Sequence, residues 1–151
     1  MKKILLSVAA VVAAAYSALA VAIVPQPQSI DKHQNAFVLL PSTTLVCASE
    51  EFAPLAAYLQ EYIPVKYISK VAPKRNYVAL SLVEGYDKEA YTLSVSRDRV
   101  EISASDYGGA FNGIQTLLQL LPSEVYTKQM SLPAVVRGCD VTDKPKFAYR
   151  A

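Results

Sequence analysis

Hydrophobic and polar residues alternate strictly over two neighbouring stretches in the middle of the chain. In residues 91–95, tyrosine, leucine and valine alternate with threonine and serine. The same alternation resumes over residues 100–103, after a short charged segment at residues 97–99. A period of two residues is typical of a strand with one buried face. The pattern therefore predicts an antiparallel hairpin.

The period lengthens directly after this hairpin, which indicates a helix that begins near Tyr107. Ser105 or Asp106 can cap its first turn, and Pro122 stops it. Four large apolar residues share one stripe at helical spacing: Phe111, Ile114, Leu118 and Leu121. A helix and a hairpin that each carry one apolar face are expected to pack against each other.

A second amphipathic helix is predicted between Ser49 and Tyr62. Ser49 can act as its N-cap, Glu50 and Glu51 suit the positive end of the helix dipole, and Pro64 ends it. Its expected buried stripe consists of Phe52, Leu55, Leu59 and Tyr62.

The rest of the chain is rich in short β-type segments. Prolines keep residues 23–30 extended, and residues 123–131 form a polar connection without periodicity. Further strands are predicted at residues 36–40, 43–48, 65–68, 76–83 and 132–141. The order of strands, helix, strands, hairpin, helix and strand indicates an α+β fold. We expect a mainly antiparallel or mixed β-sheet with two α-helices packed on one face.

The first 22 residues have the pattern of a secretory signal peptide. Lys2 and Lys3 precede an apolar run, and small residues place a cleavage site after Ala20 or Ala22. A membrane anchor is the competing interpretation, but a span needs about 20 apolar residues and prolines follow closely. We expect an exported, periplasmic or extracellular protein without a membrane span once this leader is removed.

Length and charge limit the remaining possibilities. The 151 residues, 52% of them hydrophobic, suffice for one domain with a core but not for a barrel of about 250 residues. Without the two leader lysines, thirteen basic residues balance thirteen acidic ones. No run of lysine or arginine alternates with aromatic residues, so nucleic acid is not an expected partner.

Two cysteines, Cys47 and Cys139, are the only thiols in the chain. Export would permit a disulfide between them, and two separate buried thiols are the alternative. Neither cysteine has the neighbours of a nucleophile or a metal ligand, and zinc would need more ligands than His33 and two distant cysteines provide.

No catalytic centre or cofactor site is predicted in this chain. The glycines at positions 108, 109 and 113 lack the spacing of a dinucleotide fingerprint, and we expect them to bring a helix close to the sheet. His33 lies in a polar turn and is expected to be exposed. Three acidic clusters, expected to be solvated or capping groups, are Glu50 with Glu51, Glu84 with Asp87 and Glu89, and Asp140 with Asp143.

Several stretches resemble a known family in their order and spacing. They are IVPQPQSI from Ile23, EAYTL from Glu89, GGAFNGIQTLLQLLP from Gly108 and DKPKFAYRA from Asp143. Together they are similar to the N-terminal, non-catalytic domain of the family 20 glycoside hydrolases, the β-N-acetylhexosaminidases. After the predicted signal peptide at 1–22, the resemblance implies an accessory domain at 23–142 and a linker with the start of a (β/α)8 barrel at 143–151.

The resemblance also implies a function and one substrate-binding residue. The complete enzyme is expected to remove terminal N-acetylhexosamine from glycans, while this chain lacks the family's catalytic acid pair and is expected to be inactive by itself. Arg150, three residues after Phe147, matches the family's arginine that hydrogen-bonds the terminal sugar, although Ala151 replaces the usual glycine. An alternative function is a free-standing module that binds glycans or proteins. Its candidate aromatic platform is Tyr58, Tyr62, Tyr67, Tyr77 and Tyr86.

Overall fold

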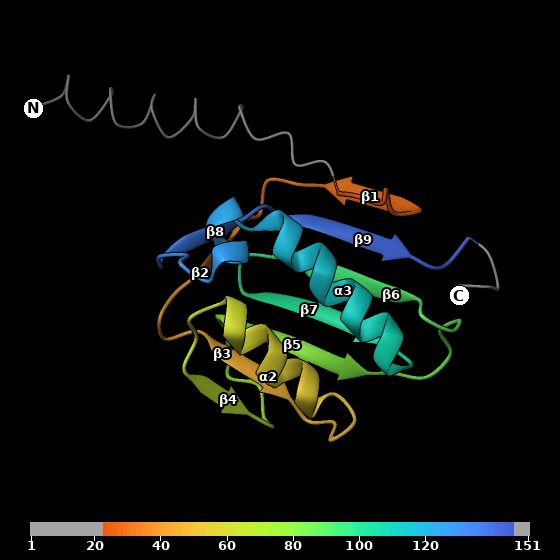
Figure 1. Cartoon of the computed structure of the whole chain (residues 1–151), viewed down its shortest axis with the longest axis horizontal. Coiled ribbons are helices and arrows are strands. Elements are labelled where there is room, and N and C mark those ends of the chain that lie inside the picture. The colour runs from red at the N-terminus through yellow and green to blue at the C-terminus, as the bar shows by residue number, and fades with distance from the viewer. Residues whose placement is uncertain (1–22, 147–151) are drawn as a thin grey trace, which may run out of the picture.

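The computed structural model of the chain describes residues 23–146, which form a mixed seven-stranded sheet, two α-helices and a small second sheet (Figure 1). The strands of the large sheet are, in chain order, β1 (Ser29–Lys32), β3 (Thr44–Cys47), β4 (Tyr67–Ser69), β5 (Tyr77–Leu82), β6 (Tyr91–Val95), β7 (Arg99–Ala104) and β9 (Cys139–Asp143). The small sheet pairs β2 (Phe37–Leu39) with β8 (Ala134–Val136). The helices are α2 (Ala53–Tyr62), α3 (Tyr107–Leu120) and the short 3-10 helix η1 (Ser123–Thr127).

The strand order of the large sheet is β1-β9-β6-β7-β5-β3-β4. The pairs on the β1 side, up to β6 with β7, are antiparallel, and the pairs from β7 to β4 are parallel. Helix α2 returns the chain between β3 and β4, which is the crossover that lets these two strands pair in parallel. The predicted α+β fold with a mixed sheet and two helices on one face is therefore confirmed.

The predicted hairpin forms the centre of the sheet, and α3 lies across it. Leu93 of β6 is paired with Ile102 of β7, and both side chains are buried under the helix. Figure 1 shows α2 and α3 side by side on the same face of the sheet. The main core therefore fills the space between this face and the two helices.

Helix α3 begins as the sequence predicts, but one residue of its expected stripe points outward. The carboxylate of Asp106 accepts a hydrogen bond from the backbone N–H of Gly109 at 2.7 Å, so Asp106 is the N-cap. Ile114, Leu118 and Leu121 are buried, whereas Phe111 is 37% exposed. The prediction that Phe111 is buried was wrong, because the glycines and Ala110 occupy the side of the first turns that meets the sheet.

Helix α2 begins later than predicted. Its N-cap is Phe52, without a side-chain hydrogen bond, so Ser49 is not the cap and the two glutamates precede the first turn. Phe52 is completely buried, and its carbonyl oxygen accepts hydrogen bonds from the backbone N–H groups of Leu55 and Ala56. Burial of this phenylalanine, rather than a polar cap, fixes where the helix starts.

The two faces of the large sheet differ in chemistry. The face opposite the helices, called here the open face, carries mostly small polar and charged side chains. By strand register they include Thr44, Tyr67, Tyr77, Ser81, Thr92, Ser94, Arg99, Glu101, Ser103, Asp140 and Thr142. A small buried cluster of Val46, Tyr77 and Ala79 lies on the same face. The open face is consequently the more polar surface of the sheet.

Side chains from the helices hold two of the connecting segments in place. The amide of Gln119 in α3 donates to the carbonyl oxygen of Val24 and accepts from its N–H, which fixes the extended segment before β1. The connection after α3, expected to be polar and irregular, contains η1 with fully buried Val125.

Between residues 23 and 146, no helix has the length and apolar character needed to cross a bilayer.

Candidate functional site

Several of the candidate acidic residues have structural partners. Asp140 and Asp143 lie on opposite faces of β9, since Asp140 accepts from the hydroxyl of Ser94 at 2.8 Å and Asp143 from the backbone N–H of Gln28 at 3.2 Å. Asp87 pairs with Lys144 at 3.2 Å. A glycosidase needs two carboxyl groups directed at one bond. In the described part of the chain, these clusters do not provide that arrangement.

The glycines of α3 have the role that the sequence predicts. A Cβ atom at Gly113 would lie 2.5 Å from Cγ2 of Ile102 and 3.2 Å from the ring of Tyr91. A Cβ atom at Gly109 would overlap the carbonyl oxygen of Ala90. Both glycines therefore bring α3 close to β6 and β7.

The two cysteines are separate buried thiols, so the disulfide alternative is excluded. Cys47 on β3 and Cys139 on β9 are separated by β5, β7 and β6, which corresponds to about 19 Å at the usual strand spacing. Burial raises the pKa of the Cys139 thiol to about 11, with a smaller contribution from Asp140. Burial also raises the pKa of Cys47. Both thiols are neutral at physiological pH and are poor nucleophiles.

His33 is less exposed than predicted and has two polar neighbours. Its Nδ1 accepts a hydrogen bond from the backbone N–H of Asn35 at 3.3 Å, and its Nε2 lies 3.7 Å from a carboxylate oxygen of Asp140. Its side chain is 30% exposed because the segment around Gly138 packs against it. Within residues 23–146, no three His, Cys, Asp or Glu side chains are grouped so that they could hold a metal ion.

The five tyrosines of the predicted aromatic platform do not share one surface. Tyr58 and Tyr62 lie together on α2, with ring centroids 5.1 Å apart. Tyr67 and Tyr77 lie on the open face, where Tyr77 is only 8% exposed, and Tyr86 contacts Thr92 on that face. Stacking of a sugar needs an accessible ring, so the buried ring of Tyr77 cannot serve a platform.

A different group of aromatic side chains gathers on the helix layer. The ring of Tyr58 lies 5.7 Å from that of Phe111 in α3, and Lys128 lies 5.2 Å above the ring of Tyr62. Tyr126 of η1 is 51% exposed, and its pKa is raised by burial and by nearby Tyr58. These four rings, Tyr58, Tyr62, Phe111 and Tyr126, are called here the aromatic patch. Sequence analysis missed this patch because it assigned Phe111 to the core.

The fold and the roles of these residues define a class of protein. A mixed sheet backed by two helices on one face is an α+β domain, and this class of fold is what the described residues form.

Comparison with known proteins identifies the family. Residues 20–144 match the family described as "Glycosyl hydrolase family 20, domain 2". The chain is 29% identical over 137 residues to a β-hexosaminidase of Porphyromonas gingivalis, covering 85% of this chain and 18% of that protein. The chain therefore belongs to glycosyl hydrolase family 20 and carries its domain 2, which confirms the resemblance seen in the sequence.

Solved structures agree with this assignment. The GH20 β-N-acetylhexosaminidase of Streptomyces coelicolor superposes with a TM-score of 0.76 at 28% identity, covering 85% of this chain and 27% of that chain. The GH20 exo-β-N-acetylglucosaminidase of Vibrio harveyi, at 23% identity, shares the fold with a TM-score of 0.70 over 85% of this chain and 20% of its own. The chain thus spans about a quarter or less of the length of these relatives.

Two predictions of the sequence fall outside the described residues. Phe147 and Arg150, the predicted sugar-binding motif, follow the last described residue, and the predicted signal peptide at 1–22 precedes the first. Both stay predictions.

Proposed function

We propose that this chain is the accessory domain of an exported β-N-acetylhexosaminidase, and that it stabilises the catalytic barrel without taking part in bond cleavage. The match of residues 20–144 to domain 2 of family 20 carries this proposal. The relatives are named as hexosaminidases, and this chain corresponds to only a fraction of each. The substrate of the complete enzyme would be a glycan that ends in N-acetylhexosamine.

The aromatic patch is the surface that we propose contacts the barrel. Phe111 and Tyr126 are exposed by 37% and 51%, in a region where Tyr58 and Tyr62 add further ring surface. Clustered exposed aromatic side chains are typical of protein interfaces, whereas the open face is mostly polar. The helix layer is thus the better docking surface of the two.

Arg150 has a proposed role in the complete enzyme. A guanidinium presents five donors in a fixed plane, which suits recognition of sugar hydroxyls. We propose that Arg150 binds the terminal sugar at the entrance to the barrel and that residues 1–22 direct export to the periplasm or the cell exterior.

An activity assay tests the proposal. The purified chain is expected not to hydrolyse an aryl N-acetylglucosaminide, and residues 1–151 joined to a family 20 catalytic barrel are expected to hydrolyse it. Turnover by the chain alone would refute the accessory role.

A pair of matched variants of the joined protein tests the docking surface. Phe111→Ser should lower its thermal stability and activity, because it removes an aromatic ring from the helix layer. Tyr67→Ser, which removes an exposed ring from the open face, is the control and should change neither. Equal effects of the two variants would contradict docking through the aromatic patch.

A further inference from the structure

One edge of the large sheet carries exposed apolar side chains. Strand β4 is the last strand of the sheet, beside β3, and lies at the edge opposite β1 (Figure 1). Tyr67 and Ile68 of this strand are 60% and 50% exposed, and Val71, two residues after its end, is 76% exposed. Among the described residues, three of the ten exposed large apolar side chains thus fall within five positions of the sequence. Exposed apolar patches mark surfaces that contact a partner or a membrane.

The turn after β4 is held by hydrogen bonds. The hydroxyl of Ser69 donates to the carbonyl oxygen of Val71 at 2.8 Å and accepts from the backbone N–H of Val71 at 3.1 Å. A serine that bonds to the backbone two residues further on closes a tight local turn. Val71 is therefore an apolar tip on a turn whose backbone is fixed by its neighbour.

The same segment is rich in basic residues. Residues 65–76 contain four basic side chains and no acidic one, whereas the two signs balance in the chain without its leader. The four exposed basic residues are Lys66, Lys70, Lys74 and Arg75. A protein without net charge has no general attraction to an anionic surface, so an attraction of this kind would come from such a local excess.

These basic side chains are largely unpaired. Lys70 lies 3.9 Å from a carboxylate oxygen of Glu50, but both side chains are mostly exposed, so the pair is weak. Within residues 23–146, the other three basic side chains of the segment have no ion pair. The segment from Lys66 to Arg75 is called here the basic rim. It places apolar side chains and positive charge on one exposed edge.

An added β-strand is not the partner that this edge favours. Strand β4 has only three residues, and lysines beside a short edge strand are a common protection against strand addition. In an antiparallel pair of two copies centred on Ile68, Lys66 of each copy would face Lys70 of the other, and like charges in opposite positions are destabilising. A soluble polyanion would pair with the lysines but would leave the apolar side chains in water.

We propose that the basic rim binds the surface of an anionic lipid bilayer edge-on. Ile68 and Val71 would enter the boundary between headgroups and acyl chains, and the ring of Tyr67 would lie among the headgroups, where amphipathic rings are favoured. The basic side chains would contact lipid phosphates, and each of them strengthens binding about fivefold. The basic rim shares no residue with the aromatic patch, so this inference does not depend on the proposed docking of the barrel.

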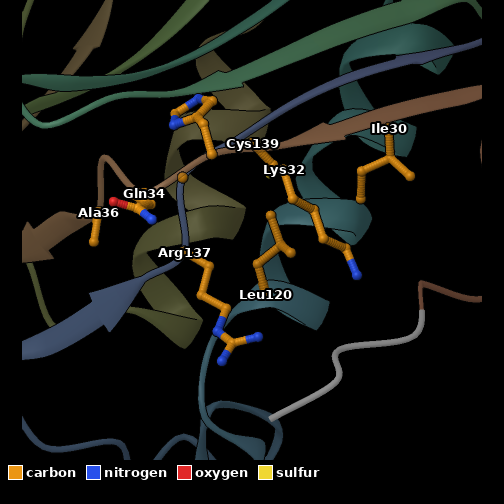
Figure 2. Close-up of a pocket in the computed structure, with 9 residues that line it drawn as sticks. Ile30, Lys32, Gln34, Ala36, Leu120, Arg137 and Cys139 are labelled. Carbon is orange, nitrogen blue, oxygen red and sulfur yellow. The ribbon is translucent and has the colours of Figure 1, made fainter. Parts of the chain in front are cut away.

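A cavity beside β1 is a competing location for a lipid. It has a volume of about 410 Å³, and Figure 2 shows Ile30, Ala36 and Leu120 around it. A volume of this size suits a single small molecule rather than a bilayer. Because β1 and β4 are the two edge strands of the sheet, the cavity and the basic rim lie far enough apart for an experiment to distinguish them.

Sedimentation with vesicles tests the proposal. All described elements lie within residues 23–146, so the chain is used without residues 1–22, whose apolar run would itself bind lipid, and far-UV circular dichroism confirms that it is folded. It should bind vesicles of equal parts phosphatidylglycerol and phosphatidylcholine. Binding to phosphatidylcholine alone should be at least about tenfold weaker, and added salt should weaken binding to the mixed vesicles.

Two variants and two matched controls locate the surface. Lys66→Gln and Val71→Ser should each weaken binding to the mixed vesicles about fivefold. Lys88→Gln removes an exposed lysine between β5 and β6, and Val135→Ser removes an exposed valine of β8. Neither control should change binding.

A paramagnetic lipid identifies the residues that meet the bilayer. In bicelles that contain this lipid, the backbone amide signals of Ile68, Lys70 and Val71 should broaden. The signals of Ile30 and Cys139, beside the cavity, should stay sharp.

Four results would overturn the proposal. They are equal binding to the two kinds of vesicle, equal effects of a rim variant and its control, binding weakened by Lys66→Gln but unchanged by Val71→Ser, and broadening confined to the cavity or the aromatic patch. The third result would indicate a polyanion site without apolar contact, and the fourth a lipid bound elsewhere. None of them bears on the accessory role, which is tested by the activity of the joined protein.

Discussion

Replacement of Gly113 by alanine tests the close packing of α3 on the sheet. A Cβ atom at this position would lie 2.5 Å from Cγ2 of Ile102, whereas carbon atoms in contact prefer about 3.5–4.0 Å. The overlap is therefore about 1 Å or more, and both Ile102 and the nearby ring of Tyr91 are buried and cannot turn away. Overpacking of this kind costs about 1–3 kcal/mol.

Helix propensity acts in the opposite direction. Alanine in place of glycine inside a helix stabilises it by about 1 kcal/mol. Because the overlap is about 1 Å or more and both neighbours are buried, the overpacking cost lies in the upper part of its range, at about 2–3 kcal/mol. The expected net loss for Gly113→Ala is consequently about 1–2 kcal/mol. For Gly109→Ala the loss should be larger, because the new Cβ atom would meet the backbone carbonyl of Ala90 and the helix itself would have to move.

Thermal unfolding followed by circular dichroism measures these effects. In a domain of this size, 1 kcal/mol corresponds to a change in Tm of about 3–5 °C, so Gly113→Ala should lower Tm by several degrees. Gly108→Ala is the matched control, because its Cβ atom would meet mainly Cγ of Glu89 at 3.0 Å, in a side chain that can shift. It should leave Tm unchanged or slightly raised. An increase in Tm for Gly109→Ala or Gly113→Ala would refute the packing argument.

Three further predictions concern the helix cap and the thiols. Asp106→Ala should destabilise the domain by about 1–2 kcal/mol in urea unfolding, because the Asp106 carboxylate accepts hydrogen bonds from the backbone N–H groups of both Gly109 and Glu89. Asp106→Asn should lose less stability, and equal losses for the two variants would contradict the capping role. Both thiols should be alkylated after denaturation without reductant, as mass spectrometry would show, and the absence of any modification would indicate a disulfide between them. Burial raises the pKa of Cys139 to about 11 in the folded domain, so as the pH rises the thiol loses its proton in the unfolded chain before it does so in the folded one. The free energy of unfolding should therefore fall between about pH 9 and 11, by about 2–3 kcal/mol in total. Cys139→Ala should remove this part of the pH dependence, and an identical slope in the variant would disprove it.

Several features could be predicted from the sequence because they depend on local patterns. The hairpin follows from alternation, and the N-cap Asp106 precedes a run with helical spacing. The function of the glycines followed from their position between a strand and a helix. The family resemblance came from the order of short motifs. Each of these signals is contained in a few neighbouring residues.

Other features required contacts between distant segments. Phe111 has the spacing of a core residue, yet it belongs to the aromatic patch because the glycine-rich side of α3 meets the sheet. Ser49 looked like a cap, but burial of Phe52 sets the start of α2. His33 was predicted to be exposed, and Gly138 from the far end of the chain packs against it.

The sequence alone determined the α+β class, the two helices, the hairpin and the family, since period, capping and motif order act over short distances along the chain. The tertiary structure alone decided the strand order, the separation of the two thiols, and the division of the tyrosines between two surfaces. These features arise from the pairing of β1 with β9 and from the packing of α3, which join residues about a hundred positions apart. Local patterns specify which face of a helix or strand is buried, but only the assembled sheet and helices specify which other element that face packs against.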